Sequence, residues 1–154
     1  MKRSAIARSV PLARTGKPKA KRAVKKKRAK TAGQLRKEAT TLWGRYIHAR
    51  DVYCQYCGKG GGLLNAHHIL PREMNATRTD EGNGVLLCAR PCHLGVMHGD
   101  PFAAVQFYTR LLGVEGYEAL RQKARDGLYK KYPVDYWRRE VERLSGLLGA
   151  LDGE

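Results

Sequence analysis

Two closely spaced cysteine pairs constrain this chain more than any other feature of its sequence. They are Cys54 and Cys57 in CQYC, and Cys88 and Cys92 in CARPC, and the chain has no further cysteine. Two turns that each present two thiolates can close a tetrahedral zinc site. Disulfides are the alternative, but we recognise no secretory segment, and pairs of this spacing are typical of a reduced compartment. The pattern therefore predicts a structural zinc site.

Four of the five histidines lie close to these cysteines: His67, His68, His93 and His98. A four-cysteine zinc site has no open coordination position, so histidine ligands require a second site. In an extended segment, His67 and His68 point to opposite faces, so one can bind a metal while the other faces a substrate water. His93 and His98 face one cavity if the segment between them is helical. A surface or satisfied core position is the alternative, which we expect for His48 and leave open for His98.

The strings CQYCG, AHHILP, NGVLLC and CH, in this order, resemble the HNH endonucleases over residues 53–98. The resemblance implies a ββα-metal core, with a first strand that ends at His67 and His68, a second strand at 85–87 and a helix that opens near Cys92. Short apolar runs at 63–64 and 85–87, separated by a polar stretch that contains glycine, independently permit this hairpin. We predict an α+β fold in which helices flank this core and a disordered basic arm precedes it.

The resemblance also implies a role for each matched residue. His67 would be a ligand of the catalytic metal, His68 the general base, Asn83 the brace of the loop that holds the base, and His93 a second ligand, with His98 as a further candidate. The implied reaction is hydrolysis of a DNA phosphodiester, which needs an activated water and a stabilised leaving oxygen. Many members carry aspartate where this chain has His67. The candidate ions are therefore Mg²⁺ or Mn²⁺ and, because nitrogen ligands suit softer ions, Ni²⁺, Co²⁺ or Zn²⁺.

Positive charge is concentrated at the start of the chain. Residues 1–30 hold thirteen lysines and arginines and no acidic residue, in a chain of formal net charge +16. Such a segment buries too little apolar surface to order itself, so we predict an arm that binds nucleic-acid phosphates. A solubilising tail and a nuclear-targeting patch over residues 21–28 are the alternatives. The candidate DNA-contacting residues are Lys21, Arg22, Lys25, Lys26, Lys27, Arg28, Arg36, Lys37, Arg45 and Arg72.

Apolar residues at helical spacing predict a first helix over residues 34–50 that packs on the zinc core. Its apolar stripe consists of Leu35, Ala39, Leu42, Trp43, Tyr46 and Ile47. Its solvent-exposed side, which could contact DNA, carries Arg36, Lys37, Arg45 and Arg50.

Asp100 and Pro101 predict the start of another helix, because a cap residue precedes a proline at the first helical position. We expect Phe102, Val105, Leu111 and Leu112 in the core, and a further helix over residues 114–124. After Pro133 we expect a final helix, whose apolar stripe forms either intramolecular core or a dimer seam. This stripe consists of Trp137, Val141, Leu144, Leu148 and Leu151. No stretch is long and apolar enough to span a membrane.

These features divide the chain into an arm (1–32), a helix (33–52), the HNH core with zinc (53–100) and a helical region (101–154).

More loosely, the layout resembles phage NinG/Rap-type and endonuclease VII-type recombination nucleases. That wider resemblance implies branched DNA, such as a Holliday junction or a D-loop, as the substrate of a homodimer in the cytoplasm or nucleoid of a bacterial cell. A homing, restriction or packaging nuclease that cuts duplex DNA would share the motif. A non-catalytic zinc-containing nucleic-acid-binding module or a ribosome-associated protein would leave the histidines unexplained.

Overall fold

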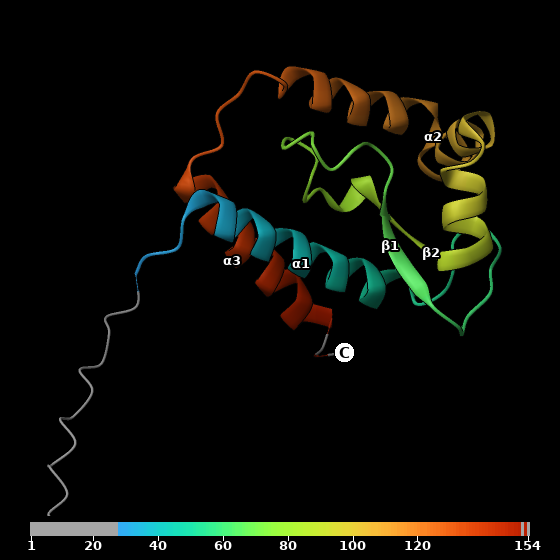
Figure 1. Ribbon diagram of the computed structural model, residues 1–154, viewed down its shortest axis with the longest axis horizontal. Coiled ribbons are helices and arrows are strands. Elements are labelled where there is room, and N and C mark those ends of the chain that lie inside the picture. Colours follow the sequence, from blue (N-terminus) through green and yellow to red (C-terminus); the bar gives the residue numbers. More distant parts are fainter. Residues whose placement is uncertain (1–27, 152, 154) are drawn as a thin grey trace, which may run out of the picture.

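The computed structural model describes residues 28–151 and residue 153. The predictions for the basic arm up to residue 27, including those for Lys21, Arg22, Lys25, Lys26 and Lys27, lie outside the described residues. The described elements, in chain order (Figure 1), are α1 (Ala32–Asp51), β1 (Leu64–His68), the 3₁₀ turn η1 (Glu81–Asn83), β2 (Gly84–Cys88), the irregular helical segment η2 (Ala89–Met97), α2 (Pro101–Asp126) and α3 (Val134–Leu151).

A two-stranded antiparallel hairpin lies between two layers of helices (Figure 1). Side chains of β2 alternate between the layers: Val85 and Leu87 join a core with α2, whereas Leu86 joins a core with α1 and α3. Because both faces are covered, every residue of β2 is buried, which explains its unbroken apolar run. The predicted fold class, a small hairpin flanked by helices, is confirmed.

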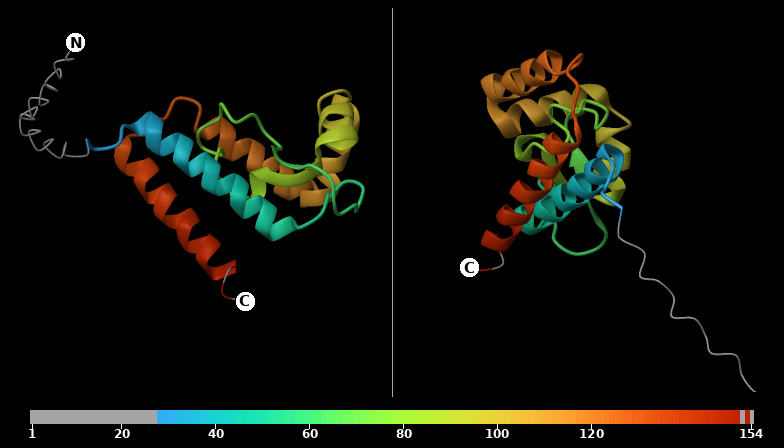
Figure 2. Two further views of the ribbon diagram at one scale, coloured as in Figure 1. Left: turned by 60° about the horizontal axis from the view of Figure 1, so that its bottom comes forward. Right: turned by 90° about the vertical axis from the view of Figure 1, so that its left-hand side faces the viewer.

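Helices α1 and α3 run side by side in the same direction (Figure 1; Figure 2). A capping box of Thr31 and Gln34 starts α1, because each side chain bonds the backbone N–H of the other residue. Trp43 of α1 and Trp137 and Leu144 of α3 share one buried core. The apolar stripe of α3 therefore packs largely within the chain, although its last residue, Leu151, is exposed.

The start of β2 lies unusually close to α1. A Cβ atom added at Gly84 would lie 2.4 Å from Cδ1 of Ile47 and 2.6 Å from Cζ2 of Trp43. Only glycine therefore allows the helix to approach the strand this closely. The contact brings Trp43 to the end of the hairpin that carries His68, the pairing partner of Gly84.

The last turn of α1 is fastened to β2 by polar contacts. The buried carboxylate of Asp51 accepts a hydrogen bond of 2.9 Å from the backbone N–H of Leu86 and pairs with Arg50. The guanidinium of Arg50 also donates to the backbone carbonyls of Glu81 and Gly84. Arg50 thus holds the helix to the hairpin, and its contact with DNA stays a prediction.

Helix α2 begins where the sequence predicts. The carboxylate of Asp100 accepts hydrogen bonds from the N–H groups of Phe102 and Ala103, and Pro101 occupies the first turn. Gly113, with φ 73°, breaks the helix into two halves (Figure 1). The second half corresponds to the helix predicted over residues 114–124.

The core face of α2 differs from the prediction. Phe102, Val105 and Leu111 are 84%, 46% and 38% exposed, so their assignment to the core is wrong, whereas the partly buried Leu112 packs against it. The buried face is formed instead by Ala104, Phe107 and Tyr108. These three residues share one side of the helix through their spacing of three and four, and this side faces the hairpin.

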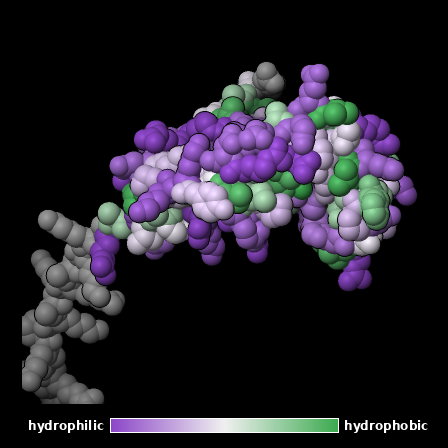
Figure 3. Space-filling view, turned by 90° about the horizontal axis from the view of Figure 1, so that it is seen from above, coloured by the Kyte–Doolittle hydropathy of each residue, from purple (hydrophilic) through white to green (hydrophobic). Residues whose placement is uncertain are grey.

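The molecular face shown in Figure 3 is mostly hydrophilic, with hydrophobic side chains in small scattered groups. Within residues 28–151 and 153, no helix combines the length and the apolar character that crossing a membrane requires.

Candidate metal centres and active site

The four cysteines come together from the turn after α1, the end of β2 and the first half of η2. Their sulfur atoms lie within 4.8 Å of one another, and all four thiols are unpaired. The Sγ atoms of Cys57 and Cys88 are 3.6 Å apart, which exceeds the disulfide length of about 2.05 Å. It is close to the separation of about 3.8 Å that two thiolates have when they bind one zinc ion tetrahedrally at about 2.3 Å. The cluster is compatible with structural zinc.

Ionisation of these thiols is uneven. Burial, reinforced by the neighbouring thiols, raises the pKa of Cys88 to about 11, and the same causes raise the pKa of Cys92. For Cys54, hydrogen bonds to backbone groups of Cys57 and Cys88 outweigh the opposing effect of burial and lower the pKa to about 7. Four thiolates can therefore coexist here only with a compensating cation. A four-thiolate donor set of this kind fits zinc.

Three histidines form a second cluster. His67 comes from β1, His93 from η2 and His98 from the residue after η2, and their ring nitrogens lie within 4.8 Å of one another. The Nε2 atoms of His93 and His98 are 3.1 Å apart, and the ring centroid of His67 lies 4.8 Å and 5.3 Å from theirs. The helical turn of η2 brings His93 and the following His98 to one side. Both lie close to His67, as candidate ligands of one metal ion.

These imidazoles are suited to bind a metal at neutral pH. Burial lowers the pKa of His67 to about 3, and the neighbouring His93 and His98 act in the same direction. Burial, followed by the effect of His98, also lowers the pKa of His93. Neutral imidazole is the form that binds metals. Three protein nitrogens leave a coordination position for water or a phosphate oxygen, as catalytic sites require.

Two residues that the sequence did not identify hold these rings. The hydroxyl of Tyr108 lies 2.7 Å from Nε2 of His67, and the side-chain amide of Asn65 lies 3.3 Å from Nδ1 of His93. Partners of this kind fix the orientation of metal-binding histidines. Asn65 precedes His67 by two residues in the same strand, so strand periodicity could have identified it. Tyr108 is 41 residues from His67, and nothing in the sequence pattern connects the two.

His68 lies on the opposite face of β1, against α1. Its ring stacks on that of Trp43, with centroids 3.8 Å apart, and its Nε2 atom lies 2.9 Å from the carbonyl oxygen of Arg78. A carbonyl only accepts, so Nε2 carries the proton and Nδ1 keeps its lone pair. Burial is the main cause that lowers the pKa of His68; the hydrogen bond to the Arg78 carbonyl opposes it, and the charge of Arg78 adds to it. The ring is therefore neutral at pH 7 and able to accept a proton.

Asn83 is fully buried behind the loop that joins the strands. Its Oδ1 atom accepts a hydrogen bond of 2.7 Å from the N–H of Leu70, and its Nδ2 donates to the carbonyls of Leu70 and Thr77 at 3.2 Å and 2.9 Å. Thr77 precedes Arg78, whose carbonyl contacts His68. Asn83 thus ties both ends of the loop together, a position in line with the bracing role that the resemblance implies.

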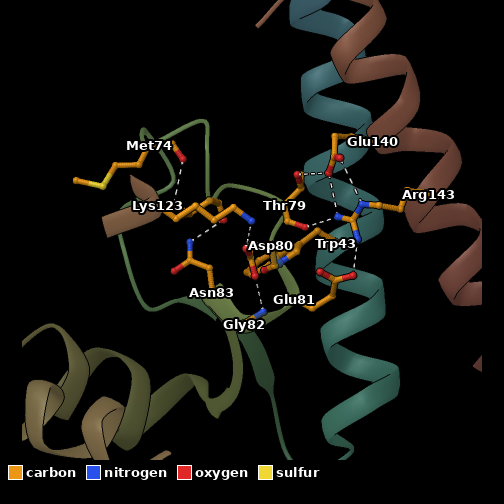
Figure 4. A network of polar contacts seen from close by, with 11 residues as sticks. Trp43, Met74, Thr79, Asp80, Glu81, Gly82, Asn83, Lys123, Glu140 and Arg143 are labelled. Carbon is orange, nitrogen blue, oxygen red and sulfur yellow. Dashed lines mark hydrogen bonds and ion pairs between the residues drawn. The ribbon is translucent and has the colours of Figure 1, made fainter. Parts of the chain in front are cut away.

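A polar network ties the same loop to the helices (Figure 4). Arg143 of α3 donates to the carbonyl of Thr79 at 2.8 Å and to the carboxylate of Glu81, while Lys123 of α2 pairs with Asp80. The network shown also includes Trp43, Met74, Gly82, Asn83 and Glu140. The loop around His68 is therefore held by all three long helices.

One cavity of about 720 Å³ brings the two histidine sites together. His67, His68, His93 and His98 line it, and Arg72 and Tyr108 contribute to its wall. Although His67 and His68 point to opposite faces, His68 is the last residue of β1, and both reach the cavity. Of the remaining candidates, His48 is exposed as expected, and exposed positions are also occupied by Arg28, Arg36, Lys37, Arg45 and Arg72.

A family model described as HNH endonuclease matches residues 54–96. The match covers well under half of the chain and includes the four cysteines, His67, His68, Asn83 and His93, but ends before His98. Neither the curated proteins nor the solved structures gave a significant match. Residues 54–96 thus form an HNH domain, set in a mixed fold of helices and one small hairpin, with four cysteines gathered for metal binding.

Proposed function

We propose that this protein is a metal-dependent endonuclease that hydrolyses DNA phosphodiester bonds at the cavity lined by the four histidines. The observation that carries the proposal is the placement of a three-histidine cluster and the neutral His68 around one cavity. A non-catalytic zinc module would need the cysteine cluster alone. It would give no reason for a second group of metal-binding side chains beside a buried, oriented imidazole.

In this proposal His68 is the general base. Its Nδ1 atom takes a proton from the attacking water, while the Arg78 carbonyl and the Trp43 ring hold the imidazole in place. Proton transfer to a positioned base typically contributes a factor of about 100 to 10,000. A divalent ion held by His67, His93 and His98 would stabilise charge on the phosphate and the leaving oxygen. Asn83 keeps the loop of the base rigid through its contacts to Leu70 and Thr77.

We also propose that Cys54, Cys57, Cys88 and Cys92 bind a structural zinc ion. Binding free energy at such a site is folding free energy, because the unfolded chain has no preformed site. Cys88→Ser should therefore lower both the zinc content and the Tm of the purified protein. Elemental analysis with thermal denaturation measures both, and a variant that keeps its zinc and its Tm would refute the assignment.

The endonuclease proposal is tested by cleavage of labelled DNA with Mg²⁺, Mn²⁺ or no added metal. Wild type should cleave only with added metal, and His68→Ala should lose at least about a hundredfold in rate while keeping its affinity for DNA. His48→Ala is the matched control, because it removes an exposed histidine outside the cavity. Equal cleavage by His68→Ala would contradict the role of His68. A wild type that cleaves nothing would favour the binding module.

The finer proposal is a preference for branched DNA, which rests on the looser resemblance to recombination nucleases. The same assay, run with linear duplex, single strand, flap and four-way junction, tests it. Cleavage confined to the flap and the junction, by a protein that sediments as a dimer, would support a resolving role. Equal cleavage of plain duplex would contradict this role and favour a homing, restriction or packaging nuclease.

A further inference from the structure

A second cavity, of about 420 Å³, adjoins the histidine cavity. Its charged lining residues are Arg36, Lys37, Arg72 and Arg78, and no carboxylate lines it. Arg72 lines both cavities, so the two share a wall. The second cavity, called the arginine pocket below, is formed by the first half of α1 and by the loop that follows β1.

Positive charge in the arginine pocket is only weakly compensated. Arg72 has one acidic partner, Glu73, at 3.4 Å, and both side chains are largely exposed. Within the described part of the chain, no carboxylate pairs with Arg36. Burial lowers the pKa of Arg78, and the charges of Arg36 and Arg72 act in the same direction, while Glu73 opposes them. Guanidinium groups that repel one another in this way favour an anion between them.

We propose that the arginine pocket binds a phosphate group of the DNA strand, next to the phosphate that is cleaved; the inference rests on the proposed endonuclease function. The planar guanidinium groups of Arg36 and Arg72 match two oxygens of a phosphate. The hydroxyls of Thr40 and Thr41, which also line the pocket, donate to carbonyls of their own helix. The arginines are therefore the main donors to the phosphate.

Arg78 connects the arginine pocket to the proposed base. Its carbonyl oxygen lies 2.9 Å from Nε2 of His68, while its side chain lines the pocket. A phosphate held in the pocket would restrain this residue and, through its carbonyl, the ring of His68. Binding of the strand would thereby orient the base at the neighbouring phosphate. This coupling gives the pocket a role beyond general attraction of DNA.

The test compares Arg36→Gln, Arg72→Gln, the double variant and Arg139→Gln. Arg139 is an exposed arginine of α3 that lines neither cavity and is not a candidate DNA contact, so its replacement removes the same charge elsewhere. Each full-length, zinc-loaded protein carries His68→Ala to keep the DNA intact. Affinity for a labelled DNA duplex is measured by fluorescence anisotropy at salt concentrations from about 50 to 200 mM. Over this range, the affinity of a protein that contacts several phosphates falls on the order of a few powers of ten.

Arg36→Gln and Arg72→Gln should each weaken binding about tenfold. Each contacted phosphate contributes about 0.9 to the slope of log affinity against log salt concentration. Because both arginines contact one phosphate, the slope of the double variant should fall by about 0.9, whereas contacts to two separate phosphates would give about 1.8. Arg139→Gln should retain the parent slope. Equal losses in Arg139→Gln, a double variant that loses about 1.8, or no loss in the pocket variants would each overturn the proposal.

Failure of the pocket and failure of the proposed function give different results. If wild type cleaves DNA while both pocket variants bind DNA as tightly as their parent, the arginine pocket binds no phosphate of the DNA, and the endonuclease proposal stands. If wild type cleaves no DNA with any metal while the pocket variants show the expected slopes, the phosphate contact stands and catalysis does not. Unchanged Tm and zinc content of the variants establish that either result reflects binding.

Discussion

The indole ring of Trp43 lies against the imidazole of His68, with ring centroids 3.8 Å apart and planes inclined by 17°. The indole N–H donates a hydrogen bond of 2.8 Å to the carbonyl of Asp80. One buried side chain therefore contacts both the proposed base and the loop that holds it. Trp43 acts in this arrangement as a positioning residue as well as a core residue.

Trp43→Phe should slow DNA cleavage while leaving DNA affinity nearly unchanged. Phenylalanine still packs against His68, but the Asp80 carbonyl loses its donor, which costs about 1–3 kcal/mol of unfolding free energy. Trp137→Phe is the matched control, because Trp137 is equally buried in the same core and does not contact His68. Single-turnover rates of the two folded variants make the comparison. Equal reductions in rate would show that Trp43 acts only through stability.

Tyr108→Phe should weaken binding of the catalytic metal. Its hydroxyl contacts Nε2 of His67 at 2.7 Å and so fixes the ring, with Nδ1 as the remaining nitrogen. Loss of such a partner typically costs a factor of about 10 to 100 in metal affinity. The dependence of cleavage on Mn²⁺ concentration and a calorimetric Mn²⁺ titration measure the loss. Tyr117→Phe, which alters the same cavity wall without contacting His67, should match wild type; a similar loss in both variants would contradict the role.

His93→Ala should reduce Mn²⁺ affinity more than His98→Ala. The ring of His93 is half-buried and contacts Asn65 as well as His98. His98 is exposed, and within the described residues its ring nitrogens have no hydrogen-bond partner besides His93. A side chain that is already oriented loses less entropy when it binds an ion. Calorimetric titration of both variants tests the order. The reverse order would make His98 the principal ligand.

The parts of the site that were predictable depend on local spacing. Alternation along one strand was sufficient to separate His67 from His68, and one helical segment was sufficient to bring His93 and His98 together. Tyr108 and Trp43 reach their histidines only through packing of whole helices against the hairpin, which periodicity does not encode. The wrong core assignment of Phe102 has the same origin. Several apolar residues could face inward from α2, and contact with the hairpin selected Phe107 and Tyr108.

Asn83→Ala should destabilise the protein markedly. The substitution removes a fully buried amide and leaves the N–H and the carbonyl of Leu70 without their partner, whereas the carbonyl of Thr77 keeps the N–H of Asp80. Each unsatisfied buried group costs about 1–3 kcal/mol. Chemical denaturation of the zinc-loaded protein should show a loss of about 2 kcal/mol or more in total. Asn75→Ala, in the same loop, is the control with a smaller expected effect, since its partly buried side chain accepts one hydrogen bond, from Nε of Arg78 at 3.2 Å; comparable losses would contradict the bracing role.

Cleavage should depend on pH through the protonation of His68. The base must be neutral to accept a proton, and burial together with the charge of Arg78 lowers its pKa below the ordinary value of 6.5. The half-maximal rate should therefore lie below pH 6.5, and the rate should rise through that pH and flatten above it. The pKa of His67, lowered to about 3, keeps this ligand neutral over the same range, and the pKa of His93 is lowered as well. Single-turnover rates at saturating Mn²⁺ from pH 5 to 8 measure the profile. A rate that climbs about tenfold per unit between pH 7 and 8 would show that another group titrates in the rate-limiting step.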